Sequence, residues 1–93
     1  SIESNLVPTV NFYEGLLGRK KAREALAHDP VLFSYSVEKR LKPRLAELLT
    51  HGLVVVDDVP INTMVKYTNQ RWEAYLARQV DKKNREKTAD GLR

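Results

Sequence analysis

Residues 29–45 read Asp-Pro-Val-Leu-Phe-Ser-Tyr-Ser-Val-Glu-Lys-Arg-Leu-Lys-Pro-Arg-Leu. A short apolar run follows the first proline and is too short for a pair of strands, so it predicts one 3₁₀ turn over residues 30–35. Apolar residues then recur at helical spacing and form one stripe, which predicts a helix over residues 36–51 capped by Ser36. The stripe consists of Val37, Leu41, Leu45, Leu48 and Leu49. Pro43 opposes that helix, so we expect either a start near Leu41 or a kink at the proline.

Helical spacing also extends on the N-terminal side of this stretch. Apolar residues over 6–17 predict a helix with Asn5 as N-cap and Gly18 as its end. Residues 19–28 predict a second, short helix, and Asp29 ends it because a residue before proline disfavours helical backbone.

On the C-terminal side, residues 53–60 predict an extended segment, with Asp57 and Asp58 available to cap the next helix. Residues 61–80 predict helix, either continuous or broken near Thr68–Asn69. Residues 81–93 predict a charged flexible tail.

The chain carries an internal repeat at an offset of 35 residues. Leu6 and Leu41 each begin a Leu-x-Pro pattern, and the two predicted helices end at Gly18 and Gly52. A period of this length is typical of helical solenoids, whose stability needs about three units. We expect one module over residues 1–80, made of a partial unit (1–35), a unit (36–60) and C-terminal helices (61–80). We also expect missing upstream repeats or a larger assembly that covers the open end.

The net charge of +4 comes from one part of the chain. Residues 19–44 hold eight bases and three acids, a net charge of +5. These bases are Arg19, Lys20, Lys21, Arg23, Lys39, Arg40, Lys42 and Arg44. The concentration predicts a surface that binds phosphates, with Arg19 and Arg23 on one helix edge and Arg40 and Arg44 on another. The alternative is a solvated helix face.

Several classes of site are disfavoured. The chain has no cysteine, so disulfides, thiolate nucleophiles and cysteine zinc sites are excluded. His28 and His51 fall at helix ends, where an imidazole commonly caps carbonyls, and no triad or metal-ligand spacing is present. We expect no catalytic residue, metal or cofactor. No apolar run approaches the roughly 20 residues of a membrane span, so we expect no membrane partner.

Four other patterns each have a structural alternative. Gly15 and Gly18 before three bases are similar to the GxxG loop of a KH domain, but both flanks predict helix rather than strand. Trp72 and Tyr75 could stack on bases, although core packing is favoured. Phe33 and Tyr35 lie between the basic clusters, and the repeat pattern favours a core position for them as well. Asp57-Asp58 could bind magnesium, although helix capping is favoured.

Residues 29–45 strongly resemble the repeat of the mitochondrial transcription termination factor (mTERF) family, in which Tyr-Ser-x-Glu leads into Lys-Arg-x-x-Pro-Arg. The resemblance is specific over residues 29–53, good over 6–28, weaker over 54–80 and similar there to the C-terminal repeat region of such proteins. It implies a right-handed stack of units, each with two α-helices and a 3₁₀ turn. It also implies an organellar protein that binds nucleic acid through a basic groove.

Three functions are consistent with these observations. The first is a non-catalytic mTERF-like protein of organellar gene expression, in a mitochondrion or alternatively a chloroplast, that clamps the backbone of duplex DNA or structured rRNA. The second is a structural subunit of an organellar ribosome, where the same bases bind rRNA and apolar ends contact ribosomal proteins. The third is a protein-interaction scaffold with Trp72 and Tyr75 as anchors.

Overall fold

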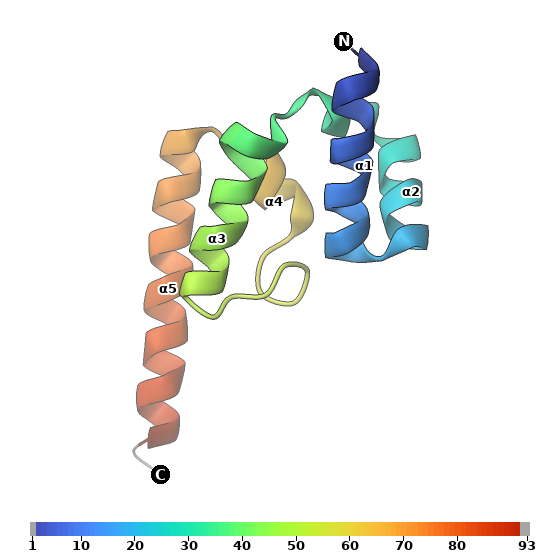
Figure 1. The fold of residues 1–93 in the computed structure, drawn as a ribbon. Helices are drawn as coiled ribbons and strands as arrows, with labels where there is room; N and C mark the ends of the chain where they lie inside the picture. The colour runs from blue at the N-terminus through green and yellow to red at the C-terminus, as the bar shows by residue number, and fades with distance from the viewer. Residues whose placement is uncertain (1, 92–93) are drawn as a thin grey trace. The chain divides into compact units, whose positions relative to one another are not determined.

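The computed structural model describes residues 2–91, with side chains placed for residues 6–87. In chain order the elements are α1 (Ile2–Leu17), α2 (Arg19–His28), the 3₁₀ helix η1 (Pro30–Ser34), the π-helical turn η2 (Val37–Leu41), α3 (Lys42–Thr50), α4 (Ile61–Lys66) and α5 (Asn69–Gly91) (Figure 1). Residues 2–91 contain no β-strand, since Val55 and Val59 form only an isolated bridge. The all-α prediction and the predicted 3₁₀ turn are therefore confirmed.

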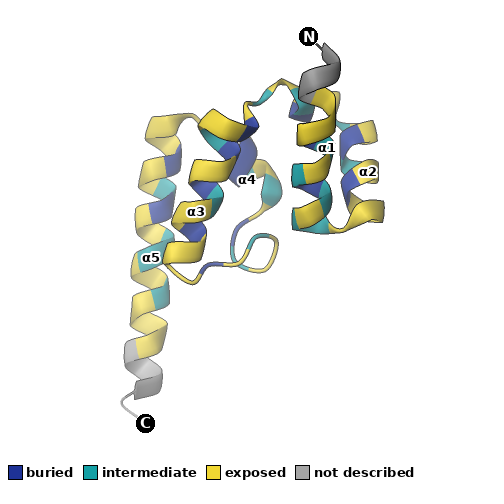
Figure 2. Ribbon diagram, viewed as in Figure 1, coloured by how far each residue is buried: buried dark blue, intermediate teal, exposed yellow. Residues whose placement is uncertain are grey.

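The chain divides into two compact units, Ser1–Arg44 and Leu45–Arg93, here named unit 1 and unit 2. Each has its own buried side chains, and each is described by itself (Figure 2). Among the described residues, no helix combines the length and apolar character needed to cross a membrane.

In unit 1, α1 packs against α2, η1 and η2. The buried apolar side chains of this unit are Tyr13, Ala22, Leu26, Leu32, Val37 and Leu41. The Tyr13 hydroxyl donates a hydrogen bond of 3.4 Å to the Leu32 carbonyl, which joins α1 to η1. Burial raises the pKa of Tyr13 to about 12, with smaller contributions from Tyr35 and Asp29. Tyr13 therefore stays protonated, and able to donate, well above neutral pH.

Gly18 joins α1 to α2 without a loop. Its N–H donates to the Glu14 carbonyl at 2.8 Å, and its own carbonyl accepts from the Ala22 N–H at 3.0 Å. The backbone turns between the two helices at φ 86° and ψ 158°, a region that is essentially restricted to glycine. Gly18 thus ends one helix and begins the next.

The start of α1 differs from the prediction. The helix begins at Ile2 rather than near Leu6, so Asn5 lies inside it and is not the N-cap. Pro8 stands in the second turn, where it deprives one carbonyl near the helix start of its partner. A loss so close to the N-terminal end does not stop the helix.

The π-helical turn η2 accommodates Pro43. The Ser36 carbonyl accepts from both the Arg40 N–H at 3.0 Å and the Leu41 N–H at 3.1 Å, so the turn widens by one residue. A proline ring clashes with the carbonyl four residues before it, and for Pro43 that carbonyl belongs to Lys39, which lies inside the wider turn. Regular α-helix begins at Lys42, with Pro43 in the first turn, which confirms the first of the two alternatives.

In unit 2, α3 ends at Thr50, and Gly52 follows it in a glycine C-cap. Gly52 has φ 69°, and its N–H donates to the Leu49 carbonyl at 3.1 Å. The next N–H, of Leu53, donates to the Leu48 carbonyl at 2.9 Å, and the side chains of Leu48 and Leu53 are buried. This pair of bonds and the accompanying apolar contact are the usual way to satisfy the last carbonyls of a helix.

The segment over residues 53–60 is a closed loop rather than the predicted extended segment. Asp58 Oδ2 accepts from the Val54 N–H at 2.8 Å, and the Asp58 N–H donates to the Val54 carbonyl at 2.7 Å. Val56 has φ 77°, an unusual value for a β-branched residue. The predicted capping role of the aspartates is wrong, because Pro60 occupies the N-cap of α4 without a side-chain bond. Asp58 instead closes the loop.

The helix predicted over residues 61–80 is broken near Thr68–Asn69, which is the second of the two alternatives that the sequence left open. α4 ends at Lys66, and the Thr68 hydroxyl accepts from the Arg71 N–H at 3.2 Å to cap α5. Met64, Val65, Trp72 and Leu76 are buried. The Trp72 Nε1–H donates to Glu47 Oε1 at 3.4 Å, which ties α5 to α3. Trp72 is therefore a core residue, as favoured, and cannot serve as an exposed anchor.

The predicted tail is also helical, because α5 continues through Gly91. Residues 81–87 are mostly good helix formers, and Asp81 pairs with Arg85 one turn away. Local propensity and charge pairing thus extend the helix beyond the half-buried apolar residue Val80. Residues 92–93 of the expected tail lie outside the described residues.

Candidate nucleic-acid interface

The first group of predicted binding residues lies on α2 and is here named the α2 cluster. It consists of Arg19, Lys20, Lys21 and Arg23, all of them exposed. Ala22 and Leu26 are the buried residues of α2, which packs against α1 (Figure 2). Because only this narrow edge is buried, the other faces of the helix, which carry the four cations, are exposed to solvent. Arg19 and Arg23 are four residues apart and so lie one above the other on the helix.

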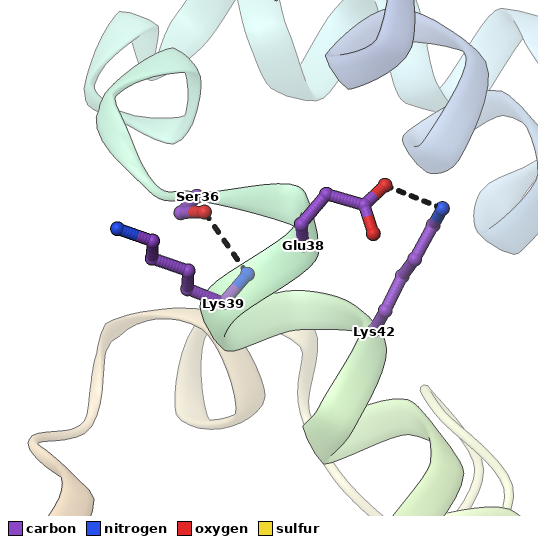
Figure 3. Close-up of polar contacts among 4 residues, drawn as sticks. All are labelled: Ser36, Glu38, Lys39 and Lys42. Carbon is purple, nitrogen blue, oxygen red and sulfur yellow. Dashed lines mark hydrogen bonds and ion pairs between the residues drawn. The ribbon is translucent and has the colours of Figure 1, made fainter.

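The second group lies on η2 and the start of α3, and is here named the η2 cluster: Lys39, Arg40 and Lys42. Ser36 caps the π-helical turn η2, because its Oγ accepts from the Lys39 N–H at 3.0 Å (Figure 3). Lys42 pairs with Glu38 at 2.6 Å. Figure 3 shows the Lys39 side chain extending away from this pair. The η2 cluster therefore does not present one continuous row of cations.

Arg40 is half-buried and stacks on an aromatic ring. Its guanidinium carbon lies 5.0 Å from the centre of the Tyr35 ring. Stacking uses the face of a guanidinium, while its N–H donors lie in the plane. Such an arrangement limits the side-chain freedom of Arg40 and orients its donors. The spacing of Tyr35 and Arg40 along the sequence gave no signal of this contact, which depends on the backbone turn between η1 and η2.

Arg40 and Arg44 do not form the exposed helix edge that the sequence predicted, because Arg44 is buried. Its side chain is only 3% exposed, so it is not available to a phosphate on the surface. Leu41, Arg44 and Leu48 stand at positions i, i+3 and i+7, and all three are buried. The sequence interpretation assigned Leu45 and Leu49 to this stripe, but Leu45 is only half-buried and Leu49 is exposed. Seven of the eight predicted residues remain accessible.

A cavity of about 450 Å³ in unit 1 opens beside the η2 cluster. Its lining consists of Pro8, Thr9, Phe33, Ser34, Tyr35, Ser36, Val37 and Glu38. Phe33 and Tyr35, favoured as core residues, are half-buried and line this space. Tyr35 thus has both the cavity and the Arg40 guanidinium beside it.

The other patterns of the sequence have structural roles. Gly15 lies inside α1 and Gly18 joins two helices, so the strands that a KH loop requires are absent from both flanks. Tyr75 is half-buried and stacks on Trp72 at 6.1 Å between ring centres. Burial raises the pKa of Tyr75, as does Tyr67, while the Arg78 charge opposes the shift. Both rings of the candidate stacking platform therefore belong largely to the interior of unit 2, as favoured.

The sequence profile of the mTERF family matches residues 3–73. The chain belongs to the mTERF family. The match covers both basic clusters, and the order of α1, α2 and η1 is the helix–helix–3₁₀ unit that the resemblance implied. Family members are helical-repeat proteins that bind nucleic acid, generally without catalysis and typically in organelles. No curated protein and no solved structure matches the chain.

Proposed function

We propose that this chain serves organellar gene expression by binding the phosphate backbone of a nucleic acid through the exposed bases of unit 1. The observation that carries the proposal is the α2 cluster, in which four cations stand on a helix whose only buried edge is apolar. Family membership supports the class of ligand. In this proposal the chain is part of a right-handed helical-repeat solenoid.

The proposed mechanism is non-catalytic. Each lysine or arginine that meets a phosphate releases condensed counterions, which makes the affinity fall with salt. Arg19 and Arg23 supply forked donors that suit phosphate oxygens, and Lys20 and Lys21 add point charges. The exposed pair of Lys42 with Glu38 contributes little to stability, so Lys42 can exchange its carboxylate for a phosphate. Arg40, stacked on Tyr35, meets the backbone in a restricted orientation.

Two triple substitutions with the same change in charge test this assignment. One replaces Arg19, Lys20 and Lys21 with Gln, and its control replaces the exposed Arg78, Lys82 and Lys87 of α5 with Gln. Removing three phosphate contacts should reduce the slope of log affinity against log salt by about 2 to 3 units, measured by mobility shift. The control should keep the slope of the unchanged protein. Equal effects of the two triples would overturn the assignment to α2.

Competition between duplex DNA and structured rRNA separates the two nucleic-acid functions. Preference for the duplex supports a role in organellar transcription, and preference for rRNA supports the ribosomal role. Mitochondrial location, with the chloroplast as the alternative, is part of the proposal and is tested by imaging a tagged chain. Binding to neither ligand would contradict the proposed function and return the basic surface to a solvated helix face.

A further inference from the structure

Unit 2 has a groove of about 430 Å³ between α3 and α5, which lie side by side in Figure 1. Its lining consists of Glu47, His51, Glu73, Leu76, Ala77, Val80, Asp81 and Asn84. The α5 members follow a helical stripe, so one face of that helix forms a whole wall of the groove. The floor includes the buried Leu76 and the half-buried Val80.

The charge of this groove is opposite to that of the chain. Its lining contains three carboxylates and no lysine or arginine, whereas the chain has a net charge of +4. Asp81 pairs with Arg85 just outside the lining. The other two charges that a ligand in the groove would meet lie one on each wall: the carboxylate of Glu73, and that of Glu47, whose Oε1 also accepts from the Trp72 Nε1–H at 3.4 Å.

This combination selects one class of ligand. Carboxylates repel phosphates, so the groove does not extend the nucleic-acid surface. A second copy of the chain could offer the basic α2, but the apolar edge of α2, Ala22 and Leu26, is already buried in its own unit. An acidic groove with an apolar floor instead fits an amphipathic helix that carries lysine or arginine beside its apolar face.

The dimensions specify the ligand further. Glu73 and Val80 are seven residues apart on α5, which corresponds to about 10 Å along the axis. We propose that this groove binds a basic amphipathic helix of a partner protein, with a cation between Glu47 and Glu73 and apolar side chains over Leu76, Ala77 and Val80. The proposal goes beyond nucleic-acid binding and is independent of it, because all of the residues involved lie in unit 2.

A synthetic peptide tests the proposal on the full 93-residue chain. The probe is a helix of about 18 residues, or roughly five turns, with leucines on one face and lysines flanking it. A scrambled peptide of the same composition, which has no apolar face, is the control. In isothermal titration calorimetry the amphipathic peptide should bind at least about tenfold more tightly than the scrambled one. Equal binding of the two peptides would overturn the proposal, because charge alone would then explain the affinity.

Matched variants of α5 locate the binding. Ala77→Arg fills the groove, while Ala74→Arg adds the same side chain at an exposed position that does not line it. The first should weaken peptide binding by about tenfold and the second should leave it unchanged. Glu73→Lys and its control Glu86→Lys should behave in the same way. Equal weakening within either pair would overturn the proposal, as would a stable dimer of the free chain in sedimentation, since the occupant would then be a second copy.

Discussion

Gly18 and Gly52 end the two helices that the 35-residue repeat aligns, yet the chain continues differently from each. After Gly18, α2 begins at the next residue. After Gly52, the chain passes through the loop closed by Asp58 before α4 begins at Ile61. A glycine at this point of the repeat therefore determines that the helix ends, and it does not determine what structure follows.

The residues after each glycine decide how the chain continues. Residues 19–28 are rich in lysine, arginine and alanine, which form helix readily. Residues 53–60 contain four valines and end in a proline, and such residues lose side-chain freedom in a helix or cannot continue one. The basic surface of unit 1 exists because the segment after Gly18 is helical and presents its cations on consecutive turns.

The largest effect should come from adding a methyl group at the two glycines. Gly18→Ala should destabilise unit 1 by about 2 kcal/mol or more, since its φ and ψ lie in a region that is nearly restricted to glycine. Gly52→Ala should cost unit 2 about 1 kcal/mol, the usual penalty of left-handed backbone. Urea unfolding followed by circular dichroism measures both.

Gly15 is the matched control for this pair. It lies inside α1 with nothing within 4 Å of an added Cβ, so Gly15→Ala should stabilise by about 0.5 to 1 kcal/mol. A larger cost at Gly52 than at Gly18 would contradict the proposed difference between the two glycines.

The loop that replaces a helix after Gly52 depends on one carboxylate. Asp58→Ala removes the acceptor of the Val54 N–H and should destabilise unit 2 by about 1 kcal/mol, again measured in urea. Asp57→Ala, at the exposed neighbouring position, should change the stability by less than about 0.5 kcal/mol. Similar costs for the two substitutions would show that Asp58 does not hold the loop closed.

Unit 1 is held instead by the hydrogen bond from Tyr13 to η1, and the stabilisation from this bond depends on pH. Tyr13→Phe should cost about 1 kcal/mol at neutral pH because the Leu32 carbonyl loses its donor. The pKa of Tyr13 is raised to about 12 from 10.0, so in this interval the unfolded state releases a proton that the folded state keeps. The stabilisation is complete below pH 10 and falls as the pH rises toward 12.

The pH dependence of the stability of unit 1 is assigned to Tyr13 if it disappears in the Tyr13→Phe variant. Resonances of α1 and α2 followed by NMR between about pH 9 and 12 should show unit 1 weakening in the unchanged chain. The same resonances in Tyr13→Phe should lack that decline. An identical alkaline decline in both proteins would assign it to other groups.

The smallest expected effect has the opposite sign. Val56→Gly relieves a positive φ at an exposed residue, and the greater freedom of glycine in the unfolded chain offsets part of the gain. The net stabilisation should be about 0.5 kcal/mol, seen as a raised urea midpoint. Val54→Gly, at an exposed valine without positive φ, should be neutral or destabilising. A gain at both positions would exclude strain at Val56 as its cause.

The elements that depend on local chemistry were predictable from the sequence. The stops at Gly18 and Gly52, the 3₁₀ turn after Pro30 and the break capped by Thr68 are all determined by residues adjacent to them. The exposure of the α2 cluster was predictable as well, because Ala22 and Leu26 define a narrow apolar edge.

The features that depend on helix register or on tertiary contacts were not predictable. Arg44 takes the buried position between Leu41 and Leu48 that the sequence interpretation gave to Leu45, because an arginine is rarely expected to be buried. The stacking of Arg40 on Tyr35 requires the turn between η1 and η2. Asp58 accepts a bond from the Val54 N–H and closes the loop, and no residue beside it in the sequence indicates this role.

The position of Trp72 gives the chain an internal reporter. It is the single tryptophan of the sequence, it lies in unit 2, and it is 2% exposed. Its emission will shift to longer wavelength when unit 2 opens to water and will not respond directly to the opening of unit 1. Intrinsic fluorescence alongside circular dichroism therefore separates the unfolding of the two units without any label.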